Sequence, residues 1–171
     1  AAKTIALAAG HYVTELNLTR SLTIVGRCAA KVTLKTTVWG SIAADWQDGP
    51  VEVELRGVTI TGPGSGVLAK NGAIVRLRRV HVVQAVGLGL GALGGKLDVE
   101  DSVIQGTTGP SGDWHGEGIG VTLGGSALLH RVRVTANAFA GIWVQGSFQG
   151  LIGDELLVDS TVASGPGAES N

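Results

Sequence analysis

Short alternations of apolar and polar residues recur along this chain at a nearly constant spacing. In five places two alternating segments begin five residues apart, within residues 53–60, 75–82, 97–104, 127–134 and 151–158. A looser copy, with one extra residue between the segments, covers Leu16–Leu18 and Leu22–Ile24. Alternation puts every second side chain on one face of a strand, and segments this short cannot be helices of ten or more residues. The pattern predicts strands throughout.

A third alternating segment follows each pair and is often introduced by glycine. These segments centre on Ile5 and Leu7, Val32 and Leu34, Val67 and Ala69, Leu88 and Leu90, Ile119 and Val121, and Ile142 and Val144. An uninterrupted repeat has about 22 to 24 residues, and each repeat can bury its apolar face only against its neighbours. We therefore expect an all-β fold, a single-stranded parallel β-helix (solenoid) of about six turns with three short strands each.

The repeat extends over one predicted domain, residues 1–171, with insertions at 36–50 and 106–117. It opens directly at Lys3 and its last apolar strand ends at Val158, without a polar terminal repeat at either end. Because a solenoid needs such caps to cover its core and its strand edges, we expect a piece of a longer chain. We also expect the isolated chain to self-associate through the uncapped ends of the rod.

Segments 4–12, 22–28 and 57–62 resemble the right-handed parallel β-helix proteins of the pectin-lyase-like superfamily. The resemblance extends over nearly the whole chain. It implies a right-handed coil, a secreted or cell-surface protein, and contact with polysaccharide. Lyases, hydrolases, tailspikes and adhesins share this repeat, so the fold does not select one function.

Composition and charge narrow the range of partners. The chain has 28 glycines in 171 residues, a single cysteine (Cys28) and a net charge of −1. Balanced charge gives no field to recruit nucleic acid, and no apolar run approaches the roughly 20 residues of a membrane-spanning helix. We expect neither nucleic-acid binding nor membrane insertion, and a lone cysteine cannot build a disulfide framework.

Charged side chains gather on the predicted outer face of the first strands. The two outward columns read Asn17, Glu54, Arg76, Asp98, Leu128, Ile152 and Thr19, Arg56, Arg78, Glu100, His130, Asp154. In lyases of the resembled family, acidic calcium ligands lie beside an Arg or Lys that abstracts a proton. The resemblance thus makes Arg76, Arg78, Asp98 and Glu100 the candidates for a lyase-like enzyme acting on acidic polysaccharide with calcium. Opposite charges on neighbouring strands also form stabilising ladders, and we favour this interpretation, which needs no cofactor.

The candidate ligand-binding residues are three tryptophans and two polar neighbours of one of them. Each insertion carries an Asp-Trp pair, and loops on a rigid scaffold often carry function. The candidates for carbohydrate contact are Trp46, Trp114, Trp143, Asp113 and His115. An indole can stack on a sugar ring, but it can equally cover an apolar patch or a subunit contact. Asp113, His115 and Glu117 alternate as metal ligands can, although we predict no metal site.

The third strands present a further outward column, Thr33, Leu68, Gly89, Gly120 and Trp143. It predicts a shallow groove beside an indole, unless the glycines serve close packing. We therefore predict a noncatalytic β-helix segment of a secreted or cell-surface protein, a structural or carbohydrate-contacting module. The lyase is the alternative.

Overall fold

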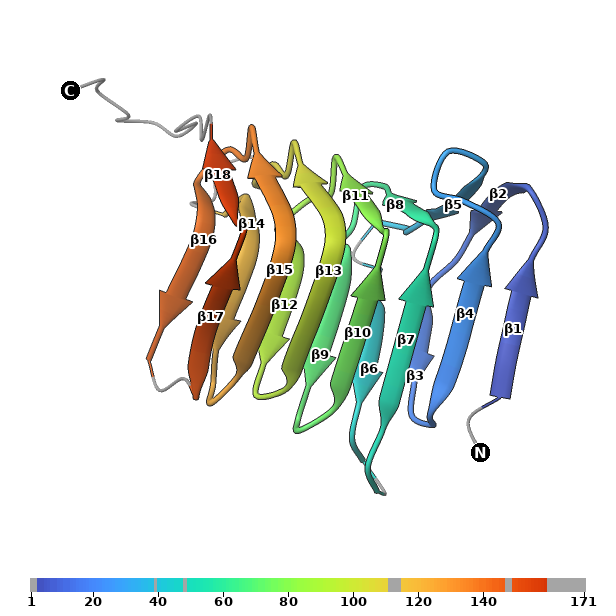
Figure 1. Ribbon diagram of the computed structural model, residues 1–171, viewed down its shortest axis with the longest axis horizontal. Helices are drawn as coiled ribbons and strands as arrows, with labels where there is room; N and C mark the ends of the chain where they lie inside the picture. Colours follow the sequence, from blue (N-terminus) through green and yellow to red (C-terminus); the bar gives the residue numbers. More distant parts are fainter. Residues whose placement is uncertain (1–2, 39, 48, 111–114, 147–148, 160–171) are drawn as a thin grey trace.

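The computed structural model describes residues 3–38, 40–47, 49–110, 115–146 and 149–159 (Figure 1). These residues form an all-β structure, and none of them lies in a helix that could span a membrane. The strands are β1 (Lys3–Leu7), β2 (Gly10–Val13), β3 (Leu16–Leu18), β4 (Leu22–Gly26), β5 (Val32–Lys35), β6 (Ile42–Asp45), β7 (Glu52–Arg56), β8 (Thr59–Thr61), β9 (Val67–Lys70), β10 (Ile74–Arg78), β11 (His81–Val83), β12 (Leu88–Leu93), β13 (Lys96–Gln105), β14 (Glu117–Thr122), β15 (Ser126–Thr135), β16 (Ala140–Gln145), β17 (Gly150–Asp154) and β18 (Leu157–Asp159).

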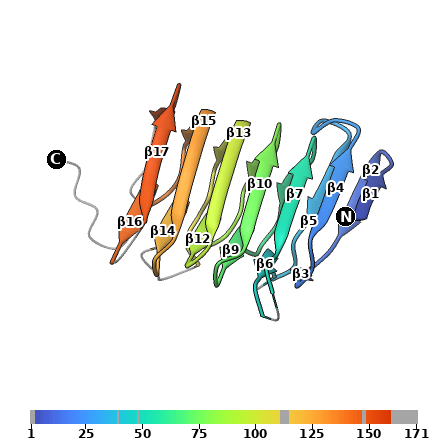
Figure 2. The same ribbon diagram turned by 60° about the horizontal axis from the view of Figure 1, so that its bottom comes forward.

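Strands pair in parallel in three rows. The first row is β1-β4-β7-β10-β13-β15-β17, the second is β2-β5-β8-β11-β13-β15-β18, and the third is β3-β6-β9-β12-β14-β16. The long strands β13 and β15 serve both the first and the second row. Each turn of the chain thus adds one strand to each row, and the turns lie side by side as a stack (Figure 2). This order is compatible with a parallel β-helix.

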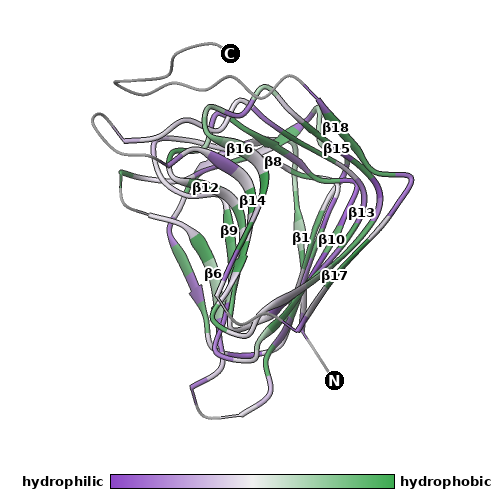
Figure 3. Ribbon diagram, turned by 90° about the vertical axis from the view of Figure 1, so that its left-hand side faces the viewer, coloured by the Kyte–Doolittle hydropathy of each residue, from purple (hydrophilic) through white to green (hydrophobic). Residues whose placement is uncertain are grey.

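The three rows surround a central space (Figure 3), and the buried apolar side chains of the core lie inside it. Equivalent inward side chains of successive turns stack in columns, such as Leu55, Leu77, Val99 and Leu129 of the first row, each with 0% exposure. The intervening residues face outward, which confirms the predicted alternation. Burial of these columns between neighbouring turns supplies the hydrophobic stabilisation that no single turn could obtain.

Corners between the first and second rows use single residues in the left-handed conformation. Gly57, Arg79, Asp101, Arg131 and Glu155 occupy equivalent corners with φ between 50° and 59°. One such residue between the two strands accounts for the five-residue spacing in the sequence. Four of these corners carry a Cβ atom, a conformation that costs roughly 1–2 kcal/mol for most residues, so neighbouring turns must hold them in place.

The sequence prediction was wrong for the first two turns. Leu16–Leu18 form β3 of the third row, whereas Leu22–Gly26 form β4 of the first row. Val32–Lys35 belong to the second row, and Ile42–Asp45, within the segment taken as an insertion, form β6 of the third row. The cause is the longer corner between β4 and β5, which hides the five-residue spacing. The stack consequently has four turns of three strands, two turns in which one long strand (β13 or β15) serves both the first and the second row, and a seventh turn with two described strands.

This shift changes the outward columns. In the first row, Thr23 aligns with Glu54 and Val25 aligns with Arg56, so these two residues take the places in the outward columns that were predicted for Asn17 and Thr19. In the third row, Gly91 rather than Gly89 aligns with Gly120, and the predicted Thr33 lies in the second row. Leucine and glycine alternate from Gly87 to Gly91, so the sequence pattern alone cannot distinguish registers that differ by two residues.

Candidate functional site

The four residues of the lyase alternative lie side by side on the outer face of the first row. Arg76 and Arg78 of β10 align with Asp98 and Glu100 of β13, respectively. Strand alternation turns all four outward, because Leu77 and Val99 between them point into the core. Their proximity was correctly predicted from the sequence.

Arg78 is bound by two carboxylates of the neighbouring strand β13. Its Nη1 and Nη2 donate to the two carboxylate oxygens of Asp98 at 3.0 and 2.9 Å, and Nη1 also donates to the backbone oxygen of Asp98 at 3.1 Å. Its Nε lies 3.1 Å from Oε2 of Glu100. The Arg78 and Asp98 side chains are only 24% and 23% exposed. This bidentate geometry is the strong form of an arginine–carboxylate pair.

Further ion pairs continue this network along the stack. Arg76 lies 2.7 Å from Glu52 and 3.9 Å from Asp98. Arg131 lies 2.5 Å from both Glu100 and Asp101. We call Glu52, Arg76, Arg78, Asp98, Glu100, Asp101 and Arg131 the charged ladder.

Two members of the charged ladder are corner residues and one lies at the start of a strand. Glu52 is the first residue of β7, and Asp101 and Arg131 occupy left-handed corners. Sequence reasoning missed Asp101 and Arg131 because the strand alternation does not show where a corner side chain points, and it missed Glu52 because it began that strand one residue later, at Val53.

Ion pairing shifts the pKa of three side chains of the charged ladder. Hydrogen bonding to Asp98 raises the pKa of the Arg78 guanidinium. Hydrogen bonding to Asp101 likewise raises the pKa of Arg131, and the same contact lowers the pKa of Asp101. A proton-abstracting base needs the opposite shift, towards the neutral guanidine. Among the described residues, no group of three His, Cys, Asp or Glu side chains is arranged to hold a metal ion.

The outer face of the third row is largely filled. Trp143 of β16 aligns with Gly120 of β14, which aligns with Gly91 of β12. A methyl group placed on Gly120 would lie 2.8 Å from Cδ2 of Leu88, and one on Gly91 would lie 2.7 Å from Cδ2 of Leu68. Leucine side chains therefore occupy the space above the glycines, which supports the close-packing interpretation over an open groove. The Trp143 side chain is half-buried.

The other ligand-binding candidates are scattered. Trp46 is 42% exposed and covers the corner at Gly72, where a methyl group would lie 2.8 Å from its Cε3. His115 is exposed, and its Nδ1 lies 3.3 Å from the carboxylate of Glu117, which is only 1% exposed. The backbone N–H of Gly116 also donates to Glu117, at 3.0 Å.

Trp114 and Asp113 lie outside the described residues. Trp46 lies in the corner that follows β6, whereas Trp143 lies in β16, and these two strands are four turns apart in the third row. The described candidates therefore do not form one compact site.

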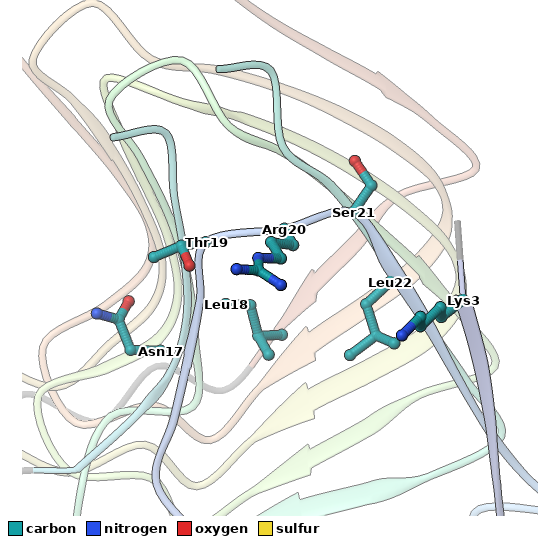
Figure 4. A pocket seen from close by; sticks show the side chains of 7 residues that line it. All are labelled: Lys3, Asn17, Leu18, Thr19, Arg20, Ser21 and Leu22. Atoms are coloured by element: carbon teal, nitrogen blue, oxygen red, sulfur yellow. The ribbon is translucent and has the colours of Figure 1, made fainter. Parts of the chain in front are cut away.

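Hollows occur at the N-terminal end of the stack. One of about 510 Å³ is lined by Lys3, Asn17, Leu18, Thr19, Arg20, Ser21 and Leu22 (Figure 4). An apolar cavity of about 320 Å³ lies among Ile5, Leu7, Tyr12, Thr14, Leu16, Leu18, Leu22, Ile24 and Leu34. Neither includes the charged ladder or the tryptophans.

Comparison of the chain with protein-family models, with curated proteins and with solved structures found no match. The functional inference therefore depends on the geometry described above.

Proposed function

We propose that the chain is a right-handed parallel β-helix of the pectin-lyase-like kind, acting as a noncatalytic structural module. The parallel rows, the inward columns and the compatible strand order support the coil. Right-handedness accords with the strong preference of parallel strand connections for that hand. The resemblance of segments 4–12, 22–28 and 57–62 to that superfamily supports a secreted or cell-surface location.

One observation carries the noncatalytic assignment, namely the binding of Arg78 between Asp98 and Glu100. In a lyase the base removes a proton from the sugar ring, and the acidic groups hold calcium against the substrate carboxylate. Here the carboxylates neutralise arginines of the neighbouring strands instead. Both groups are thus engaged in the contacts that join turn to turn.

Turnover of uronate polymers in the presence of calcium tests this assignment. A lyase breaks the glycosidic C–O bond, leaves a ring carbon–carbon double bond and thereby creates a product that absorbs ultraviolet light. We expect no such product from the 171-residue chain. The control variant is Arg56→Met, because Arg56 is an exposed arginine that pairs with Glu54 on the same face. The lyase would be favoured if the product forms, is lost in Arg78→Met and is kept in Arg56→Met.

Carbohydrate contact is the second candidate function, and Trp143 favours it. Its neighbours Ile142 and Val144 pack against the core, so the half-buried indole lies on the outer face of β16. A partly exposed indole can stack on a sugar ring. Trp143→Ala should then abolish glycan binding on an array, whereas Trp46→Ala, which removes the indole that covers Gly72, should retain it. Equal loss in both variants, or binding in neither the parent nor the variants, counts against carbohydrate contact.

A further inference from the structure

A further hollow, of about 670 Å³, lies on the outer face of the second row. Its polar lining residues come from four successive turns, and they are His11 of β2, Thr33 and Lys35 of β5, Thr61 of β8 and Gln84 after β11. These four strands lie side by side (Figure 1). Because neighbouring strands are about 4.8 Å apart, the hollow extends about 14 Å along the side of the stack. We call it the second-row hollow.

Strand alternation points the polar side chains of the second-row hollow away from the core. Leu34, between Thr33 and Lys35, is only 3% exposed, so its two neighbours in β5 face outward. His11 aligns with Thr33, and Lys35 aligns with Thr61. These side chains therefore occupy two adjacent outward columns, where groups from neighbouring strands can reach one ligand.

Several donors in the second-row hollow have capacity left for a ligand. Lys35 forms no ion pair with a carboxylate of the described residues. The Thr59 hydroxyl, on the same strand but outside the hollow, donates to the backbone oxygen of Ala29 at 2.8 Å. Within the described part of the chain, no such bond engages the hydroxyl of Thr33 or Thr61.

The outer face of the second row carries basic residues and, at the outward positions of β2, β5, β8, β11, β13 and β15, no acidic ones. The basic residues at these positions are His11, Lys35, His81 and Arg133. None of the residues found to line the second-row hollow is acidic. In the charged ladder, by contrast, each arginine has a carboxylate partner. The second-row hollow therefore presents positive charge that no lining residue neutralises, which favours an anionic ligand.

We propose that the second-row hollow binds a tetrahedral oxyanion, either as free phosphate or sulfate or as the same group in an ester. Lys35 supplies the cation, and the hydroxyls of Thr33 and Thr61 supply donors from two strands. The ring N–H of His11 and the side-chain amide of Gln84 add further donors at the edges of the hollow.

The arrangement of these donors favours a tetrahedral anion over a planar carboxylate. They approach from neighbouring strands, and lysine acts as a point charge, whereas a planar carboxylate is matched by the fork of arginine. A phosphate ester carries about −1.5 to −2 charges at neutral pH, so Lys35 attracts it more strongly than a singly charged carboxylate. This proposal uses neither the charged ladder nor Trp143, so it can fail while the proposed function holds.

Titrations of the 171-residue chain followed by two-dimensional NMR of the backbone amides test the proposal. The probes are inorganic phosphate, glucose 6-phosphate, glucuronate and glucose, at an ionic strength of about 0.1 M, where screening limits the effect of distant charges. Both phosphates should shift amides of residues 11–13, 33–35 and 59–61, and glucose should shift none. Glucuronate should bind at least about threefold more weakly than glucose 6-phosphate. Equal affinity for the two phosphates identifies the free anion as the ligand, and tighter binding of glucose 6-phosphate identifies an ester.

Two variants and two matched controls locate the site. Lys35→Met should weaken glucose 6-phosphate binding at least about fivefold, because it removes the lysine charge. Thr61→Val should weaken it at least about threefold, because it removes one hydroxyl donor. Lys31→Met, on the same face of the sequence segment but outside the hollow, and Thr59→Val should each change the affinity less than about twofold.

Four results would overturn the proposal. The first is the absence of amide shifts with either phosphate, and the second is a set of shifts confined to residues outside the second-row hollow. The third is binding of glucose or glucuronate as tight as that of glucose 6-phosphate. The fourth is an affinity that Lys35→Met and Thr61→Val leave unchanged, or that Lys31→Met lowers as much as Lys35→Met does.

Discussion

The pairing of Arg78 with Asp98 allows a quantitative test of the charged ladder. If the ladder stabilises the stack, Arg78→Met should lower the free energy of unfolding. Methionine keeps an apolar stem over the strand but leaves Asp98 and Glu100, which lie on one face of β13, without their shared cation. The variant removes charge pairing while changing packing little.

The expected magnitude follows from the exposure and geometry of the pair. Fully exposed ion pairs contribute about 0–1 kcal/mol. Here the side chains are about three-quarters buried and the contact is bidentate, at 2.9 and 3.0 Å. We therefore expect a coupling energy near the upper end, about 1 kcal/mol, and a total loss of about 1–2 kcal/mol for Arg78→Met, because Asp98 loses its bidentate partner and Glu100 keeps only Arg131.

A double-mutant cycle measures this coupling. Urea unfolding of the parent, Arg78→Met, Asp98→Asn and the double variant, at one protein concentration and low salt, gives the four free energies. Arg76→Met is the matched control, because Arg76 and its nearest partner Glu52 are more exposed, at 36% and 51%. Its loss should stay below about 0.5 kcal/mol.

Two outcomes would refute the structural interpretation. The first is a coupling energy below about 0.3 kcal/mol, the error of such cycles. The second is an Arg78→Met variant more stable than the parent, because residues held for activity often cost stability. The slope of free energy against urea should not change, so a changed slope would indicate a different unfolded or folded state.

Three further predictions concern acid sensitivity, the core and a corner. The Arg131 contact lowers the pKa of Asp101 in the folded state, so its stabilisation is present above the unfolded pKa of about 3.9 and is lost as pH falls through the lower folded value. Asp101→Asn, which tolerates the left-handed corner, should therefore flatten the fall in unfolding free energy below about pH 4; an unchanged pH profile contradicts this. In urea unfolding, Leu77→Ala should lower the free energy of unfolding by about 2–5 kcal/mol because Leu77 is fully buried, and Ile5→Ala should lower it by less than about 1 kcal/mol because Ile5 is 47% exposed. Equal losses in the two variants would contradict the core of stacked inward columns. Gly64 lies in the corner between β8 and β9, where a methyl group would lie 2.1 Å from the backbone oxygen of Gly40. Gly64→Ala should therefore lower the melting temperature by several degrees. An unchanged melting temperature would show that this corner can move to make room for the methyl group.

Much of this arrangement was predictable from the sequence because buried columns impose a period. From β7 onward, five-residue spacings identify the strands, and the alternation around Leu77 and Val99 places charged side chains outward. In the first two turns, a longer corner between β4 and β5 interrupts this spacing, and the apolar pattern alone assigned β3 and β4 to the wrong rows. The sequence pattern aligned Gly89, instead of Gly91, with Gly120, because alternating glycines have no side chain that indicates which face of the strand they occupy.

The contacts within the charged ladder were harder to predict from the sequence. Arg131 occupies a left-handed corner, a conformation that arginine seldom adopts. Its contacts with Glu100 and Asp101 bridge the corner, and no alternation rule predicts them. The filling of the third-row face by Leu88 likewise depends on a side chain lying across two glycines, which strand periodicity does not encode.

The most direct test of the charged ladder as a structural element is the effect of acidic oligosaccharide and calcium on unfolding. A ligand that binds only the folded state raises the unfolding free energy, by about 2.7 kcal/mol at 100 times its dissociation constant. Urea unfolding of the 171-residue chain with millimolar calcium and an oligouronate should give the same midpoint as without them. A midpoint that rises with ligand concentration, and that no longer rises in Asp98→Asn while still rising in Glu155→Lys, would instead identify the ladder as a binding site.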